Sequence, residues 1–434
     1  MAVHVHGWWL ALACLMIGAV PGAAPATARA GISITAPITG MALRVDPRGT
    51  YTITARRPAW TFTGATGGPL SALATHTGSD RLGRYTEVSF SYGDSASLHA
   101  GIRLYATRAA VLFSQHYLVP DAAPVRFPIL TTYPRDLFHL SYSGHFAIYT
   151  FHILSPSGPW LWFNRHDDIF LLSPAANFLS ADMTMGPGGA LSSGIDPAIT
   201  RLPQGFTQQT LLVVGHGINA VYDAWGQAMT RLQGKKRPTN EATPELKYLG
   251  YWTDTGAAYY YNYDHSLGYA GTLLAVRRMF QRLRVPLGYL QLDSWWYPKG
   301  STTTWQGSGL LRGGIYRYVA APALFPQGLA RFQRQVGLPL IVHARWIDPS
   351  SPYRRQYRMS GNVITDPRYW QQTAAYLSQA GVITYEQDWL GSFAHAAMNL
   401  SDPAAFLDQM AAATQARGIS LQYCMPLPED LLQT

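Results

Sequence analysis

Cysteine and charge are both scarce in this 434-residue sequence. Of its two cysteines, Cys14 lies in an N-terminal segment that we expect to be removed, which leaves Cys424 alone and excludes an intramolecular disulfide. Charged residues make up only 13% of the chain and hydrophobic residues 47%, a balance that excludes a disordered or fibrous protein. The net charge of +9 is spread thinly, with one basic run of three at 235–237, so we predict no nucleic-acid partner.

Long apolar runs are missing after the N-terminus. The first 30 residues contain an apolar run from Trp8 to Val20, followed by small residues that end at Ala30, although no Lys or Arg precedes the run. A membrane-spanning helix needs about 20 apolar residues, so this shorter run is typical of a signal peptide. We therefore predict a secreted or periplasmic protein that has no membrane association once residues 1–30 are removed.

Residues 31–217 lack long helical periodicity. They consist of short β-branched and aromatic runs, such as 86–92 and 146–153, which are separated by Gly, Pro, Asp and Ser. This alternation predicts an antiparallel β-sandwich domain. Residues 218–244 are expected to form a connecting helix, over 219–232, and then a polar linker that contains two prolines.

Residues 245–434 follow another pattern, in which apolar strands alternate with helices. The expected strands end at Asp254, Asp293, Arg345, Asp388 and Cys424. This repetition predicts a TIM-type (β/α) barrel, which needs eight such units where this sequence supplies five. The predicted fold is thus a multi-domain chain with an antiparallel β-sandwich followed by an incomplete barrel. Either the chain is cut short, or the open edge of a partial barrel is covered by something else.

Carboxylates and aromatic residues gather at these strand ends. Glu386 and Asp388 are two residues apart, so both side chains leave one face of the strand, with Tyr385 and Gln387 on the other. Carboxylates beside flat aromatic rings are suited to sugars, because the rings stack on sugar faces and the polar groups bind hydroxyls. For any single acid, a solvated loop position or an ion pair with Arg345 is an equally good explanation.

The layout resembles a clan of retaining glycoside hydrolases that holds alpha-galactosidases, raffinose synthases and alpha-glucosidases. The resemblance covers almost the whole mature chain and includes Asp293-Ser-Trp-Trp after the second strand and Glu386-Gln-Asp388-Trp after the fourth. It implies a glycoside or oligosaccharide substrate, no cofactor, and Asp388 as the nucleophile of a double displacement on alpha-glycosidic bonds. The expected substrate-binding residues are Asp254, Asp293, Trp252, Trp295, Arg345, Glu386 and Trp389.

Two departures from that family pattern bear on activity. Glu386 stands where the family usually has lysine, and its repulsion with Asp388 should raise the pKa of at least one of the two carboxyls. The family's general acid/base comes from beyond the fifth strand, and no residue of this sequence can be matched to it. The chain is therefore expected to be an alpha-glycosidase, with a catalytically inactive carbohydrate-binding relative or a transglycosylase as alternatives.

An arginine and a histidine at the third strand are expected to have structural roles. Arg345 follows the third strand and is expected to pair with Asp293 or Asp388, or else to bind an acidic sugar. His343 lies in the same strand without metal-ligand spacing to another histidine, so we expect a core residue and no metal site. The sequence leaves the oligomeric state open.

Overall fold

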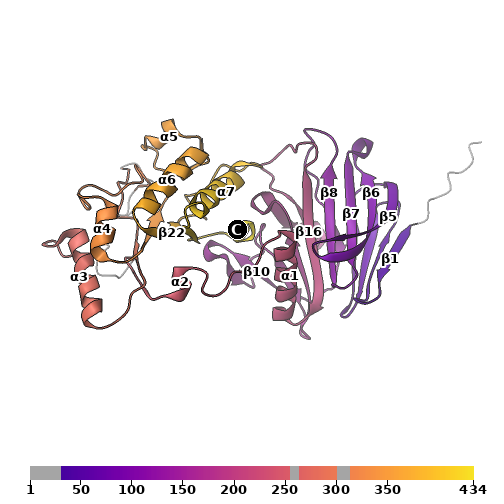
Figure 1. The fold of residues 1–434 in the computed structure, drawn as a ribbon. Helices are drawn as coiled ribbons and strands as arrows, with labels where there is room; N and C mark the ends of the chain where they lie inside the picture. Colours follow the sequence, from indigo (N-terminus) through magenta and orange to yellow (C-terminus); the bar gives the residue numbers. More distant parts are fainter. Residues whose placement is uncertain (1–30, 255–262, 301–312) are drawn as a thin grey trace, which may run out of the picture. The chain divides into compact units, whose positions relative to one another are not determined.

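The computed structural model describes residues 31–254, 263–300 and 313–434. The predicted signal peptide lies outside the described residues. The chain is multi-domain and rich in antiparallel sheet, with three larger sheets of seven, nine and five strands (Figure 1). No helix in the described ranges is long and apolar enough to span a bilayer.

The first two sheets pack face to face. The seven-stranded sheet has the order β1 (Ile32–Ala36), β2 (Met41–Val45), β3 (Thr50–Arg56), β4 (Ala59–Ala65), β9 (Ile129–Thr132), β15 (Leu191–Ile195) and β14 (Ala181–Met185). Their shared core contains residues of both sheets, among them Ile53, Phe62, Phe113 and Leu212. The alternation of apolar and polar residues therefore correctly predicted a β-sandwich.

The nine-stranded sheet is covered on its second face by a helix. Its order is β11 (Ile148–Thr150), β10 (Phe138–Ser143), β12 (Trp160–Phe163), β13 (Asp168–Pro174), β16 (Thr207–His216), β8 (Ala110–Tyr117), β7 (Leu98–Tyr105), β6 (Gly83–Tyr92) and β5 (Ser71–Asp80). Helix α1 (Ile218–Leu232) lies beside β16 and packs Val221 and Met229 against Leu211 and Leu171 (Figure 1).

One predicted strand of the sandwich is much shorter than expected. Residues 146–153 alternate like a strand, yet only Ile148–Thr150 pair in β11. Phe146 and Ala147 have positive φ angles of 65° and 44°, which interrupt the extended backbone. The side chains of Tyr149 and Phe151 are exposed, so no core contact holds this segment in a longer strand.

The third sheet is parallel and follows the chain order. Its strands are β17 (Gly250–Trp252), β18 (Tyr289–Leu292), β19 (Leu340–Ala344), β22 (Val382–Gln387) and β23 (Ser420–Tyr423). Between and after these strands lie α3 (Gly268–Arg282), α4 (Leu329–Val336), α6 (Pro367–Gln379), α7 (Asp402–Gln415) and α8 (Pro428–Gln433). Shorter elements are α2 (Pro244–Lys247), α5 (Tyr353–Gln356) and the hairpin β20 (Met359–Ser360) and β21 (Val363–Ile364).

The two faces of the parallel sheet differ in polarity. On one face Leu292, Val342 and Tyr385 join the core formed with the helices. On the other face the strand register aligns His343 with Glu386 and Glu386 with Gln422. Because neighbouring residues in register point to the same side, the second face presents a row of polar side chains. All five strands run the same way, so their carboxyl ends share one edge.

Candidate active site

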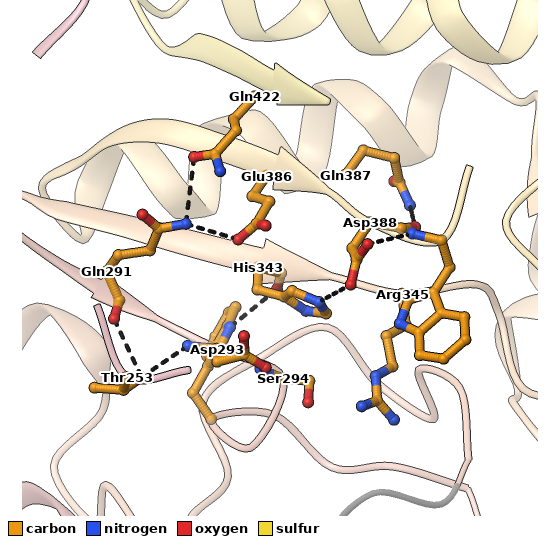
Figure 2. Close-up of polar contacts among 12 residues, drawn as sticks. Thr253, Gln291, Asp293, Ser294, His343, Arg345, Glu386, Gln387, Asp388 and Gln422 are labelled. Carbon is orange, nitrogen blue, oxygen red and sulfur yellow. Dashed lines mark hydrogen bonds and ion pairs between the residues drawn. The ribbon is translucent and has the colours of Figure 1, made fainter. Parts of the chain in front are cut away.

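Polar and ionisable residues gather toward the carboxyl edge of the parallel sheet. Four neighbouring strands contribute them, each at its end or just beyond: Cys424, together with Gln291, Asp293, His343, Arg345, Glu386, Asp388 and Gln422, which Figure 2 shows. The apolar residues between them in the sequence face the helices, which explains why short strands with a two-residue period deliver several polar groups to one place.

Asp388 follows β22 and is held at both carboxylate oxygens. Its Oδ2 lies 2.9 Å from His343 Nε2, and its Oδ1 accepts the Trp389 backbone N–H at 2.6 Å. Burial disfavours the charged carboxylate, but the hydrogen bond and the charge of His343 outweigh it and lower the pKa of Asp388 below its ordinary value. Asp388 is therefore a buried carboxylate that stays ionised.

Trp389 has a backbone conformation that is rare for a large residue. Its φ angle is +67°, in the left-handed region that usually needs glycine. This turn directs the Trp389 N–H back to the Asp388 carboxylate, and the indole packs against Trp346 and Phe393 at 5.3 and 5.7 Å between ring centroids. Such strained positions cluster at functional sites, where the surrounding packing holds them.

His343 is the residue that sequence analysis missed. It was expected to be a core histidine, and it is buried, but its ring contacts Asp388 across the strands. Burial works against protonation, yet the carboxylates Asp293, Asp388 and Glu386 raise the pKa of His343 above its ordinary value. A signal for its role was present, because His343 lies two residues before Arg345 and therefore on the same face of the strand.

Glu386 lies deeper on the same face and is fully buried. Its Oε2 accepts a hydrogen bond from Gln291 Nε2 at 2.8 Å, and the same nitrogen lies 3.3 Å from Gln422 Oε1. Its Oε1 has no hydrogen-bond partner among the described residues. Burial, opposed by His343 and reinforced by the carboxylates Asp293 and Asp388, raises the pKa of Glu386 to about 7. Burial is thus the main cause of the raised pKa of Glu386, the predicted repulsion from Asp388 adds a smaller part, and the pKa of Asp388 is lowered.

Asp293 is joined to the neighbouring strand through Thr253. The Thr253 hydroxyl donates to the Gln291 carbonyl at 3.2 Å and accepts the Asp293 backbone N–H at 3.0 Å. The Asp293 carboxylate accepts the Ser294 backbone N–H. Asp254 is the residue after Thr253 and is half-buried. The acids that follow β17 and β18 therefore lie at the same edge of the sheet.

The tryptophans expected to bind sugar differ in exposure. Trp252 is 40% exposed, and Trp389 is half-buried. Trp295 is only 2% exposed, and its indole stacks on Tyr269 and Phe325 with ring centroids 4.6 and 5.7 Å apart. Both neighbours are protein rings, so in this structure Trp295 packs in the core and presents no open face to a ligand. A direct sugar contact by Trp295 remains only a prediction.

Arg345 is expected to pair with Asp293 or Asp388, and Asp388 pairs with His343 instead. The ion pair of the Asp388 carboxylate within the described ranges is with His343, while Arg345 donates to the Gly313 carbonyl at 3.2 Å and lies against Trp346 and Trp389 (Figure 2). His343 has the shorter side chain and is aligned with Glu386 on β22, which places its ring beside Asp388.

Lys299, another residue that the sequence did not indicate, lies in the segment after β18. Burial and the Arg345 cation, opposed by Asp293, lower the pKa of Lys299 to about 7.

Among the described residues, no group of three or more His, Cys, Asp or Glu side chains is arranged to hold a metal ion.

Comparison with known proteins identifies structural neighbours only. No family model and no curated protein matches the sequence. The alpha-N-acetylgalactosaminidase NagBb from Bifidobacterium bifidum, in its GalNAc complex, gives a TM-score of 0.55 at 12% identity and covers 90% of this chain and 76% of that chain. A beta-arabinopyranosidase gives 0.54 at 11% identity, with 93% and 68% covered.

A third neighbour is a variant of the GH36 alpha-galactosidase AgaA from Geobacillus stearothermophilus in complex with stachyose. Its TM-score is 0.53 at 11% identity, and the match covers 84% of this chain and 61% of that chain. At such low identities these likenesses show a shared fold and nothing about the residues of the site.

Proposed function

We propose that this chain has the fold and site of a glycoside hydrolase that acts on alpha-glycosides through a covalent glycosyl–Asp388 intermediate. The parallel sheet is then part of a (β/α) barrel, in which sites lie at the carboxyl ends of the strands. The support from the fold is that neighbours described as an alpha-N-acetylgalactosaminidase and an alpha-galactosidase were solved with GalNAc and with stachyose.

The observation that carries this proposal is the state of Asp388. It is a buried carboxylate at a strand end, it is ionised because His343 lies beside it, and two donors fix its oxygens. A carboxylate nucleophile needs these properties, since it must be charged and oriented before it attacks the anomeric carbon. Glu386 does not have them, because burial favours its neutral form.

In the first half-reaction a carboxylate oxygen of Asp388 forms a bond to the anomeric carbon while the bond to the leaving oxygen breaks, and that oxygen takes up a proton or, in an activated phenol, departs as the anion. Water then attacks the same carbon and loses a proton to solvent or to the departed anion, the carboxylate is released, and the configuration is retained. Asp293 and Asp254, at the ends of the adjacent strands, are proposed to bind ring hydroxyls. The half-exposed indoles Trp252 and Trp389 offer apolar surface for the sugar ring.

The first test is turnover of a panel of aryl alpha-glycosides by the wild-type chain and by Asp388→Asn. The leaving groups should be strongly activated phenols, which depart without a proton, because the general acid is not assigned. Removing the nucleophile should lower turnover by about 10³-fold or more. Asp223→Asn, an exposed carboxylate on α1, is the matched control and should retain full activity. Unchanged turnover in Asp388→Asn would remove Asp388 from the mechanism.

A catalytically inactive carbohydrate-binding relative is the second candidate. It is favoured by the carboxyls that lie near Asp388: Glu386 is fully buried, and the Asp293 carboxylate is buried and accepts the Ser294 backbone N–H, so neither is placed as an obvious proton donor to a leaving group. Sugar binding in calorimetry without turnover of any activated glycoside would support this candidate. A transglycosylase is distinguished by its products when an acceptor sugar is in excess.

We also propose export, with residues 1–30 as the signal. The mature chain would then begin at Gly31, which mass spectrometry of protein recovered from outside the cytoplasm determines. An intact N-terminus on such protein would contradict the proposal.

A further inference from the structure

A buried histidine lies between two acids on the polar face of the parallel sheet. His343 is in register with Glu386 on the adjacent strand, and its Nε2 is 2.9 Å from Asp388 Oδ2. The side chains of His343 and Asp388 are 2% and 10% exposed. Solvent therefore screens this pair weakly, and its electrostatic interaction is correspondingly strong.

The backbone that carries the imidazole is fixed on its strand. The His343 carbonyl accepts two hydrogen bonds, from Trp296 Nε1 at 3.1 Å and from the Tyr318 hydroxyl at 3.1 Å. On the far side of the ring, the Tyr297 hydroxyl lies 3.5 Å from Nδ1 (Figure 2 shows the ring directed at Asp388). The Tyr297 hydroxyl can accept from Nδ1–H of the protonated ring or donate to Nδ1 of the neutral ring, so this contact is compatible with the protonated ring.

The charged groups that face His343 come from every strand around it. Asp293 follows β18, Glu386 and Asp388 belong to the β22 segment, and these three carboxylates favour the imidazolium. Cys424 beyond β23 contributes no charge, because burial raises the pKa of its thiol. Arg345, directly after β19, and Lys299, after β18, supply cations to the same region, and burial and Arg345 lower the pKa of Lys299, so Lys299 carries less positive charge near neutral pH.

We propose that His343 is a positioning residue of the candidate site: as a cation it keeps Asp388 ionised and oriented, and Glu386 extends the pH range over which that cation persists. The part of this inference that concerns catalysis rests on the proposed function, whereas the ion pair itself does not. Below neutral pH Glu386 is neutral and Asp388 and Asp293 sustain the cation. When Glu386 ionises, a further negative charge stabilises the imidazolium.

These contacts fix both carboxylate oxygens of Asp388, which matters for the proposed reaction. Oδ1 is directed by the Trp389 N–H and Oδ2 by His343, so the carboxylate is oriented before substrate binds. When the glycosyl–Asp388 bond breaks, its electron pair returns to the carboxylate, and the imidazolium N–H is already in place to stabilise that charge.

The first experiment follows the histidine directly and needs no activity. The protein is labelled with carbon-13 at the histidine Cε1 position, and the His343 resonance is identified as the one absent from His343→Gln. It should titrate above the ordinary histidine pKa of about 6.5. Asp388→Asn and Glu386→Gln should each lower its pKa, because each removes a carboxylate. Titration at or below the ordinary value, or no response to Asp388→Asn, would overturn the ion pair.

The second experiment measures the effect of the pair on turnover. His343→Gln keeps an N–H donor for Asp388 but removes the charge, so the acid limb of the kcat/KM profile should move to higher pH by about 1 to 3 units. His395→Gln, which changes an exposed histidine in the segment between β22 and α7, is the control and should leave the limb in place. An unmoved limb in a folded His343→Gln, checked by thermal unfolding, would refute the catalytic role. If the wild type turns over no glycoside, the proposed function fails and the titration alone decides the ion pair.

Discussion

Two carboxyls of β22, two residues apart, acquire opposite properties. The pKa of Asp388 is lowered because the charge and hydrogen bond of His343 outweigh burial, while burial and two neighbouring carboxylates raise that of Glu386 to about 7. The sequence alone indicates that the two acids share a face and repel each other. It does not indicate which one stays charged, because that depends on His343, which is 45 residues from Asp388 along the chain. Pairs of acids with pKa values pushed apart are frequent in catalytic sites.

The raised pKa of Glu386 predicts a pH-dependent stability. Between the unfolded value of about 4.5 and about 7, the unfolded chain has released this proton and the folded chain has kept it. Stability therefore falls as the pH rises through this window. Glu386→Gln removes this component, so its free energy of unfolding should fall less between about pH 5 and about pH 7, by on the order of 2 kcal/mol.

Urea unfolding at the two pH values measures this difference. Asp223→Asn, which changes an exposed carboxylate, should show the same pH dependence as the wild type. If the free energy of unfolding changed equally between the two pH values in Glu386→Gln and in the wild type, Glu386 would ionise in the folded chain as it does in the unfolded chain.

At the scale of elements, periodicity predicted most of the second half of the chain. The strand expected to end at Asp388 is β22 at Val382–Gln387, and the helix that the alternation predicts before it is α6 at Pro367–Gln379. These elements have strong local signals, namely apolar runs and an Asp-Pro start. The hairpin β20–β21 and the short β11 were not predicted correctly, because two- and three-residue strands depend on tertiary pairing and leave no period to detect.

The N-terminus of α6 offers a test of one such local signal. Asp366 is the cap of this helix: its side chain accepts the Arg368 backbone N–H at 3.0 Å, and its ion pair with the Arg368 guanidinium lowers its pKa. Asp366→Ala should lower the free energy of unfolding by about 1 kcal/mol, since the cap is lost. Asp366→Asn retains a capping oxygen and should lose less. Equal stability of the alanine variant and the wild type in urea unfolding at neutral pH would show that the cap contributes nothing.

At the scale of the whole molecule, the sequence predicts the order of sandwich, connecting helix and alternating strands and helices. This order follows from composition and from the positions of glycine, proline and polar residues between the apolar segments. The sandwich core and the core of the parallel sheet are separate clusters of buried residues, as expected for a multi-domain chain. The sequence does not predict which side chains of different strands lie in contact within the site. The sequence favours Arg345 as a partner of Asp293 or Asp388, because buried acids need partners, yet the strand register brings His343 to Asp388.

The most direct measurement of the central claim is the trapping of a covalent glycosyl–enzyme. A 2-deoxy-2-fluoro alpha-glycosyl donor with a dinitrophenyl leaving group needs no general acid for the first step, and its fluorine slows the second step. The wild-type chain should gain the mass of one fluoroglycosyl group, and peptide mapping should place it on Asp388. Asp388→Asn should gain none. A label on another carboxyl, or no label although glycosides are turned over, would contradict the account.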